Sequence, residues 1–176
     1  MAAETWNFDV AHSLVGFSVR HLMIAKVHGS FTRFSGQILF DAQNPAASTV
    51  EAEIDVASIE TRDAQRDGHL KSPDFFDVAK YPHLTFKSTS VERQGEHFAV
   101  HGDLTLHGVT RPVTFGVEYG GRAKAPIRGD ERVGFSAHTH LDRKDFGLTW
   151  NAVLDAGGVA VGDKVEVTLE IEAVKA

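Results

Sequence analysis

Apolar residues recur at every second position in run after run along this chain. In the last run, Val165, Val167, Leu169 and Ile171 alternate with polar neighbours. Successive side chains of a strand point to opposite faces, so this period predicts a strand with one apolar and one wet face. The same period recurs at residues 15–19, 38–40, 50–56, 84–86, 98–106, 113–119 and 133–137. The sequence therefore predicts an all-β fold of about eight antiparallel strands.

Short turn signals separate most of these runs. They are Gly29-Ser30, Asn44-Pro45, Gln94-Gly95, His107-Gly108, Gly120-Gly121 and Gly157-Gly158. Connections this short favour pairing between strands that follow one another in sequence, which gives a meander. Alternation alone does not decide whether the meander closes into a barrel or folds into a sandwich. The difference bears on function, because an eight-stranded barrel can hold a small ligand whereas a sandwich fills its middle with side chains.

The alternation stops in an insert between Ser58 and Tyr81. Thr61 is expected to cap a helix that starts at the next residue, and Gly68 is expected to end it. The triplet Ser72-Pro73-Asp74 predicts the start of a second helix, because Ser is a good cap and Pro fits the first helical position. We therefore expect one or two short helices near residues 61–80.

The insert carries charges that do not stabilise its own helix. Arg62 and Arg66 lie four residues apart, as do Asp63 and Asp67, and like charges at this spacing repel by a few tenths of a kcal/mol. These side chains are expected to find partners elsewhere in the fold or on a ligand. The apolar members of the insert are expected to pack on the interior, and they are Leu70, Phe75 and Phe76.

Size and composition limit the classes of function. The 176 residues, 42% of them hydrophobic, are enough for one domain spanning residues 1–176. A net charge of -6 opposes a broad phosphate-binding face, so no nucleic acid partner is expected. The absence of cysteine excludes disulfides and thiolate ligands. No apolar run approaches the ~20 residues that span a bilayer, so no stable membrane insertion is expected.

The beginning of the chain shows no basic segment followed by a long apolar run. As written, the protein is therefore expected to be cytoplasmic, or periplasmic if a leader has been removed.

An ordered set of motifs resembles the YceI-like family. The motifs are Asp9-Val-Ala-His-Ser-Leu-Val-Gly-Phe17, Val19-Arg-His-Leu22, Gly29-Ser-Phe31, Arg62-Asp63 through His69-Leu70, Asp74-Phe-Phe-Asp77, Tyr81-Pro82, Phe86-Lys-Ser88, Gly102-Asp-Leu-Thr-Leu-His-Gly-Val-Thr-Arg-Pro-Val113 and Asp142-Arg-Lys-Asp-Phe-Gly-Leu-Thr-Trp150. Each motif alone is ordinary, but together they cover almost the whole chain in order. The resemblance implies a lipocalin-like antiparallel barrel whose apolar cavity holds polyisoprenoids such as quinones or prenyl pyrophosphates. It also implies a homodimer, and many similar proteins are exported.

The apolar tail would supply most of the affinity for such a ligand. Burying one five-carbon unit releases roughly 3 to 4 kcal/mol, whereas a charge-assisted hydrogen bond to the head adds about 1.5 to 3 kcal/mol. The candidate tail contacts are large apolar residues, which otherwise would be ordinary core. They are Phe17, Val19, Phe40, Phe75, Phe76, Phe86, Leu104, Phe115, Phe135 and Trp150.

Charged residues in and near the insert would contact the head of the ligand. Guanidinium groups present a planar fork to phosphate or to a quinone oxygen. The alternative is a polar clasp, in which salt bridges and hydrogen bonds hold the insert to the barrel. The candidates for either role are Arg20, His21, Arg62, Asp63, Arg66, Asp67, His69 and Arg143.

Three other functions compete with lipid binding. His138 and His140 point to one face of a strand about 7 Å apart, but two ligands fall short of a metal site, so no metal is expected. The chain has no nucleophile elbow, zinc-protease or nucleotide-binding motif, so we expect no enzyme and no required cofactor beyond a bound isoprenoid. An enzyme acting on a prenyl lipid at the barrel mouth remains the alternative. The basic loop Gly121–Arg128 is the candidate for an interaction module, although it is typical of a solvated connection.

Overall fold

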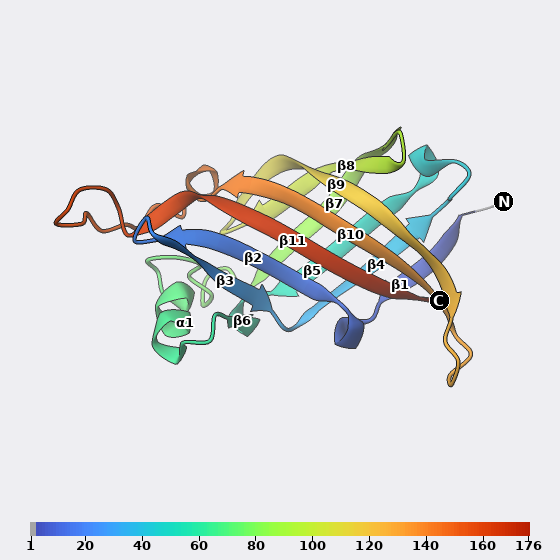
Figure 1. Cartoon of the computed structure of the whole chain (residues 1–176), viewed down its shortest axis with the longest axis horizontal. Coiled ribbons are helices and arrows are strands. Elements are labelled where there is room, and N and C mark those ends of the chain that lie inside the picture. The colour runs from blue at the N-terminus through green and yellow to red at the C-terminus, as the bar shows by residue number, and fades with distance from the viewer. Residues whose placement is uncertain (1–2) are drawn as a thin grey trace.

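The computed structural model describes residues 3–176 and shows a closed antiparallel barrel of eight strands (Figure 1). The elements are β1 (Glu4–Phe8), β2 (Leu14–His21), β3 (Ala25–Phe31), β4 (Phe34–Phe40), β5 (Thr49–Asp55), β6 (Ile59–Glu60), α1 (Ala64–Lys71), β7 (His83–Gln94), β8 (His97–Leu106), β9 (Val109–Lys124), β10 (Glu131–Asp142) and β11 (Val161–Lys175). Single 3-10 turns interrupt them at η1 (Val10–His12), η2 (Pro45–Ala47), η3 (Val56–Ser58) and η4 (Arg143–Phe146). The predicted fold class is confirmed.

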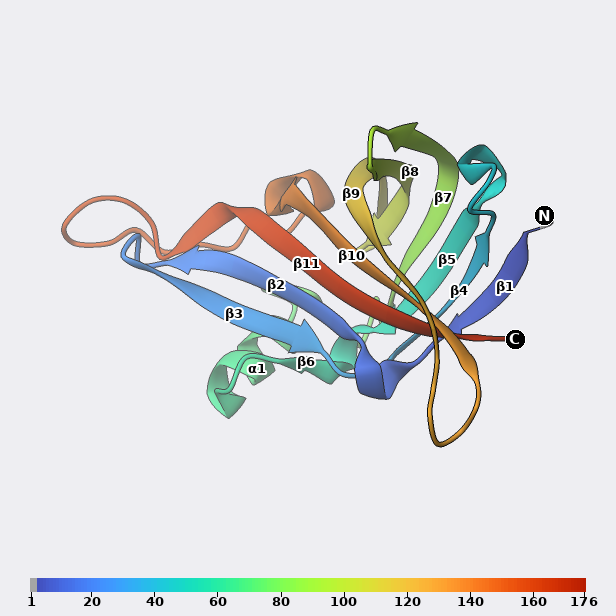
Figure 2. The ribbon, with the colours of Figure 1, turned by 45° about the vertical axis from the view of Figure 1, so that its right-hand side comes forward.

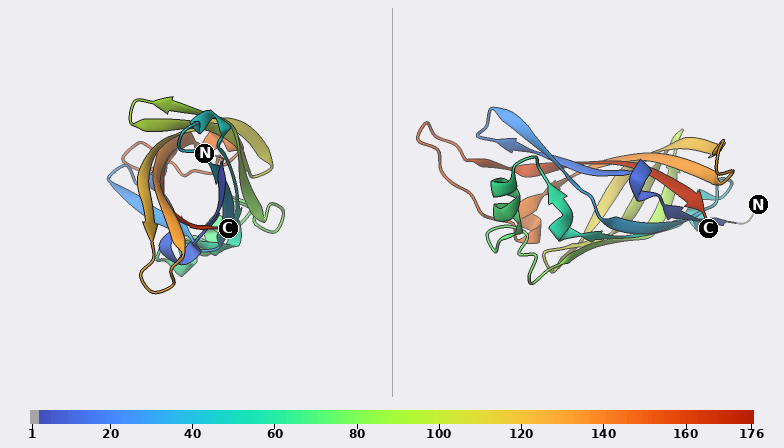
Figure 3. Two further views of the ribbon diagram at one scale, coloured as in Figure 1. Left: turned by 90° about the vertical axis from the view of Figure 1, so that its right-hand side faces the viewer. Right: turned by 90° about the horizontal axis from the view of Figure 1, so that it is seen from below.

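The strands form a ring in the order β1, β4, β5, β7, β8, β9, β10 and β11, and pairing of β11 with β1 closes it. Seen end-on, the strands surround a common axis (Figure 3). The labels β2, β3 and β6 belong to segments that continue β1, β4 and β5 past a break in each strand. The closed ring decides between the barrel and the sandwich, which the alternation left open.

The first break lets two strands share one edge of β11. Residues 173–175 pair with β1, whereas residues 161–170 pair with β2. At Glu172, between the two registers, the backbone bonds to the chain that crosses over: Asp9 donates its N–H to the Glu172 carbonyl at 2.8 Å. The Glu172 N–H donates to Ser13 Oγ at 3.0 Å. The edge therefore loses no hydrogen bond at the break.

The second break is centred on Ser58, whose side chain is buried. Its Oγ accepts hydrogen bonds from the backbone N–H groups of Thr32 and Arg33 at 3.1 and 3.0 Å. It donates to the Asp55 carbonyl at 2.6 Å. Beyond this point β6 pairs with β3, while β7 pairs with β5 and β8 but not with β6, so the sheet parts between β6 and β7. The insert, with α1, lies at this opening (Figure 2).

The insert contains one α-helix, within the one or two expected, but its ends differ from those predicted. Asp63, not Thr61, is the N-cap, because its carboxylate accepts from the N–H groups of Gln65 and Arg66. The helix passes through Gly68 and ends at Lys71, with Ser72 as its C-cap. No second helix follows, although the Ser72 hydroxyl accepts from the Asp74 N–H at 3.3 Å while it donates to the His69 carbonyl at 2.6 Å. Residues 72–80 form turns instead.

Two glycine pairs that we predicted as turns lie inside strands. Gly29-Ser30 belongs to β3, and Gly120-Gly121 belongs to β9. At the second pair Gly121 has φ +108°, and the register with β10 shifts next to Gly134. A glycine therefore marks a bulge there and not a chain reversal.

Among the described residues, no helix is long and apolar enough to cross a membrane.

Candidate functional site

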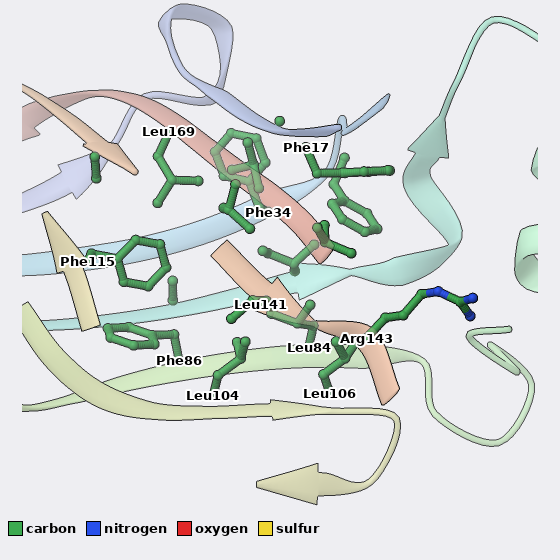
Figure 4. A pocket seen from close by; sticks show the side chains of 18 of the residues that line it. Phe17, Phe34, Leu84, Phe86, Leu104, Leu106, Phe115, Leu141, Arg143 and Leu169 are labelled. Carbon is green, nitrogen blue, oxygen red and sulfur yellow. The ribbon is translucent and has the colours of Figure 1, made fainter. Parts of the chain in front are cut away.

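The barrel encloses a cavity of about 760 Å³. Its wall is formed by the inward side chains of the strands, and most of them are aliphatic or aromatic (Figure 4). Protein interiors normally leave few voids larger than a water molecule, so a space of this size is not a packing defect. It lies within the range of about 300 to 1,000 Å³ that is typical of ligand pockets.

Close approach of aromatic rings to glycines keeps the cavity wide. A Cβ on Gly29 would overlap the ring of Phe17, and a Cβ on Gly36 would overlap the ring of Phe8. These rings therefore lie flat against the wall in the space that a side chain would have filled. Gly29, which we predicted to mark a turn, is required here because a ring covers it.

Aromatic side chains of the wall pack against one another in pairs. Phe86 and Phe115 meet edge to face with ring centroids 5.2 Å apart. Phe31 packs in the same way against Phe76 of the insert at 6.0 Å. Edge-to-face pairs contribute about 0.5 to 1.5 kcal/mol beyond their buried area. Phe76 thus ties the insert to the barrel while it lines the cavity.

One end of the cavity, next to α1, is polar, and we call it the polar end. It is lined by Arg20, His21, Asp63, Gln65 and His69. Arg20, Asp63 and Gln65 are exposed, so the cavity reaches the surface here.

An aromatic cluster covers the polar end from the side. The ring of Trp150 meets His69 at 4.8 Å and Phe75 at 5.3 Å between centroids. His69 is held in place because its Nε2 lies 2.9 Å from the Asp74 carboxylate. The cluster joins the helix to the loop that precedes β11.

Arg143 is buried in the wall, where it donates hydrogen bonds to the backbone of a neighbouring loop. Its side chain is 4% exposed, and it donates to four backbone carbonyls, those of Leu148, Trp150, Val161 and Gly162, at 2.6 to 3.2 Å. Burial lowers the pKa of its guanidinium, and Asp163 at 3.8 Å acts in the opposite direction. With most of its donors engaged, Arg143 holds the loop 147–162 to the barrel.

Thr61 joins the two charged residues that face it from α1. Arg66 donates to Thr61 Oγ1 at 2.8 Å and to its carbonyl at 2.6 Å. Asp67 accepts from the backbone N–H and the hydroxyl of Thr61 at 2.9 and 2.5 Å. Across residues 3–176 no ion pair joins the arginines and aspartates of the insert, so the predicted salt bridges are replaced by this buried threonine.

The comparisons with known proteins agree with this architecture. A family model described as the YceI-like domain matches residues 6–173. The chain belongs to the YceI-like family.

Relatives of this YceI-like protein align over most of their length. Protein YceI of Escherichia coli O157:H7 is 40% identical over 164 residues, which cover 93% of this chain and 82% of that protein. A UPF0312 protein of Photorhabdus laumondii is 42% identical over 146 residues, 82% of this chain and 76% of the relative.

Solved structures share the fold. BcnA of Burkholderia cenocepacia superimposes with a TM-score of 0.83 at 25% identity, covering 94% of this chain and 98% of that chain. A structure described as a polyisoprenoid binding domain from Saccharophagus degradans gives a TM-score of 0.68 at 16% identity, covering 97% and 98% of the two chains. At that identity the second likeness concerns the fold alone.

The YceI-like barrel places all ten candidate tail residues on the cavity wall. These are Phe17, Val19, Phe40, Phe75, Phe76, Phe86, Leu104, Phe115, Phe135 and Trp150. Wall residues that we did not single out include Phe31, Phe34, Leu141 and Leu169. Leu169 stands in the last alternating run, so the same period could have found it. Their contact with a ligand stays a prediction.

Six of the eight polar candidates also line the cavity, namely Arg20, His21, Asp63, Arg66, His69 and Arg143. Arg62 and Asp67 do not. Arg62 has φ +66° and lies ahead of the helix, because Asp63 and not Thr61 is the cap. Asp67 faces Thr61 instead of the cavity.

The histidine pair does not form part of the site. His138 and His140 are both exposed on β10, as the alternation predicted. Elsewhere in residues 3–176, Asp9, His12 and Glu172 bring donor atoms within 4.8 Å of one another. Arg132 already lies between the two carboxylates, 2.5 Å from Asp9 and 2.6 Å from Glu172, and supplies the positive charge there.

Proposed function

We propose that this YceI-like protein binds a long-chain isoprenoid lipid in its barrel cavity and carries or stores it without chemical change. The observation that carries the proposal is a cavity of about 760 Å³ with a long, mostly apolar wall, whose charged lining residues gather at the end beside α1. This division matches a ligand with a long apolar tail and a small polar head. The described ligand class of the Saccharophagus degradans domain, which has the same fold, supports it.

Burial of the tail accounts for the affinity. Each buried CH₂ group is worth about 0.8 kcal/mol, so four isoprene units give roughly 12 to 16 kcal/mol before the cost of ordering the chain. Branched methyl groups on the tail fit a wall made of Phe, Leu and Val side chains. The wall contributes no ionic partner along most of its length, so it would reject a chain with internal charges.

The polar end favours an uncharged head, such as a quinone ring, over a pyrophosphate. Arg143 and Arg66 already donate to protein oxygens, and Asp63 places a carboxylate at the same end. A pyrophosphate would therefore meet one uncommitted guanidinium, that of Arg20, and one repelling carboxylate. A quinone needs only a hydrogen-bond donor, which Arg20 can supply, and flat neighbours, which are His69 and Trp150.

Extraction of the freshly purified protein tests the proposal. Organic solvent should release an isoprenoid lipid that mass spectrometry identifies in near-stoichiometric amount. The extracted protein should then rebind an added quinone of similar tail length more tightly than the matching prenyl pyrophosphate. Absence of lipid, together with failure to bind either compound, would refute lipid binding. Conversion of an added prenyl lipid into a new product would show an enzyme instead.

A further inference from the structure

Two loops beyond the polar end of the cavity carry a cluster of exposed apolar side chains. One is the β2–β3 turn, and the other is the loop that leads into β11. Both extend past the barrel at the α1 end (Figures 1 and 3). The exposed fractions are 39% for Leu22, 56% for Met23, 81% for Ile24, 84% for Val153 and 36% for Val159. We call these five residues the apolar tip.

The apolar tip is one unit because the two loops contact each other. The Leu22 N–H donates to the Ala160 carbonyl at 2.8 Å. A Cβ on Gly158 would overlap the sulfur of Met23, so the Met23 side chain lies against the glycine of the second loop. The apolar side chains are thus gathered at one place and not scattered singly.

The β2–β3 turn places two large apolar residues at positive φ angles. Leu22 has φ +51° and Met23 has φ +62°. Asn and Gly are the residues favoured at such positions in hairpin turns, since bulky residues strain the backbone there. Two large apolar residues occupy the positions instead, and both are exposed rather than buried in the core.

The backbone of the apolar tip has many of its hydrogen bonds satisfied internally. In the turn, Ile24 donates to the His21 carbonyl at 3.2 Å. In the second loop, Leu154 donates to the Gly158 carbonyl at 3.0 Å and Ala160 to the Ala152 carbonyl at 2.9 Å. Groups paired in this way can enter an apolar medium without losing a bond to water. Asp155 is the one charged residue in residues 151–160, and Arg20 and Lys26 flank the turn.

We propose that the apolar tip inserts into the surface of a lipid bilayer, so that an isoprenoid passes between the membrane and the cavity without crossing water. The inference rests on the proposed function. Its basis is continuity, because His21 and Ala160, which line the cavity, are the direct neighbours of Leu22 and Val159. A membrane dissolves the same apolar chain that the cavity would hold.

A bilayer fits the apolar tip better than a second copy of the protein does. A stable protein interface buries about 800 Å² on each partner, more than five partly exposed side chains supply. The tip is convex and protrudes, whereas a protein partner would need a matching groove. A thin apolar wedge next to the exposed guanidinium of Arg20 is typical of segments that lie at a membrane interface, whereas Lys26 on the other side of the turn is paired with Glu166 at 2.9 Å.

Vesicle flotation tests the inference. The full chain is mixed with phosphatidylcholine vesicles, with and without about 30 mol% phosphatidylglycerol, and the membrane-bound fraction is measured. The variant with Ile24→Glu and Val153→Glu should bind vesicles roughly tenfold less than the unmodified protein, because each charge must leave water to insert. Both residues are more than 80% exposed, so the variant should fold normally.

The matched control is Ile127→Glu. Ile127 is 97% exposed on the β9–β10 loop, away from the apolar tip, and its substitution should leave flotation unchanged. Failure of the unmodified protein to float with either vesicle, or equal flotation of all three proteins, would overturn the inference. So would a self-association that the tip variant loses, since it would show that a second copy covers the tip.

A separate binding measurement distinguishes this inference from the proposed function. A long-tailed quinone added in detergent, with no vesicles present, should bind the tip variant as tightly as the unmodified protein, while quinone transfer from vesicles should slow. If the detergent-solubilised quinone binds neither protein, the proposed function fails. If it binds both but neither protein floats, only the membrane inference fails.

Discussion

Gly29 determines how far the Phe17 ring can lie from the cavity axis. The substitution Gly29→Ala should push this ring inward, because the added Cβ would overlap it. We expect a cost of about 1 to 3 kcal/mol in unfolding free energy and weaker binding of long-tailed quinones, with short tails affected less. Calorimetry and a tail-length series would measure both effects.

Gly68→Ala is the matched control, since nothing lies within 4 Å of its added Cβ. It should stabilise α1 by up to about 1 kcal/mol and leave binding unchanged. Equal binding by the Gly29 and Gly68 variants would contradict the role given to the Phe17 ring.

Individual residues show what the sequence could and could not predict. Period two identified the wall, because strand geometry alone decides that Phe17 and Phe115 point inward. The polar groups were harder to place, since their roles depend on loops brought together by the fold. Arg143 donates to carbonyls up to 19 residues away, and Arg66 and Asp67 meet at a threonine rather than each other. No local spacing indicates such partners.

At the scale of elements, Ser58 allows the paired strands to part beside the insert. Ser58→Ala would remove the acceptor of two backbone N–H groups, those of Thr32 and Arg33. We expect a loss of about 1 to 3 kcal/mol in unfolding free energy, measured by denaturant titration. Ser35→Ala on the exposed face of β4 is the control and should change stability by less than about 0.5 kcal/mol. A Ser58 variant as stable as the control would contradict this role.

The breaks themselves were not predictable from alternation, because apolar and polar residues continue to alternate on both sides of them. They depend on side chains that replace strand partners, as Ser13 and Ser58 do. The helix ends were also missed. Thr61 and Asp63 are both good caps by residue type, and the contact of Thr61 with Asp67 leaves the cap to Asp63.

Leu22 and Met23 in the β2–β3 turn are predicted to lower the unfolding free energy relative to residues that favour positive φ. Leu22→Asn combined with Met23→Gly should relieve the positive φ angles and raise the unfolding free energy by about 1 kcal/mol or more. The same change should weaken vesicle binding, because it removes two members of the apolar tip. Thermal unfolding and flotation measure the two effects. A variant that is no more stable, or one that floats as well as the original, would contradict this account.

At the scale of the whole molecule, the stability of the closed barrel should fall in acid. Hydrogen bonds from Arg132 and His12 lower the pKa of Asp9, which lies where β1, β2, β10 and β11 meet. A carboxyl whose folded pKa is below its unfolded value of about 3.9 stabilises the fold above that pH. That contribution is lost as the pH falls through the lower, folded pKa.

Melting temperatures between about pH 7 and about pH 3 test this dependence. Asp9→Asn should lower the melting temperature at neutral pH and flatten its fall in acid, since the variant has no proton to take up at this site. Asp103→Asn removes an exposed carboxylate on β8 and should keep the original profile. If the Asp9 variant kept the original dependence of melting temperature on pH, Asp9 would not be responsible for the acid sensitivity.

Removal of the lipid should destabilise the whole barrel, because the cavity would then be empty or filled with water. A ligand that binds only the folded state adds RT ln(1 + [L]/Kd), or about 2.7 kcal/mol at a hundredfold excess over Kd. Solvent-extracted protein should therefore melt at a lower temperature than the protein as purified, and added quinone should restore the difference. The Gly29→Ala variant should recover less with a long-tailed quinone than with a short-tailed one, since its cavity is narrower. Equal melting temperatures before and after complete extraction would mean that any released lipid was not held in the cavity.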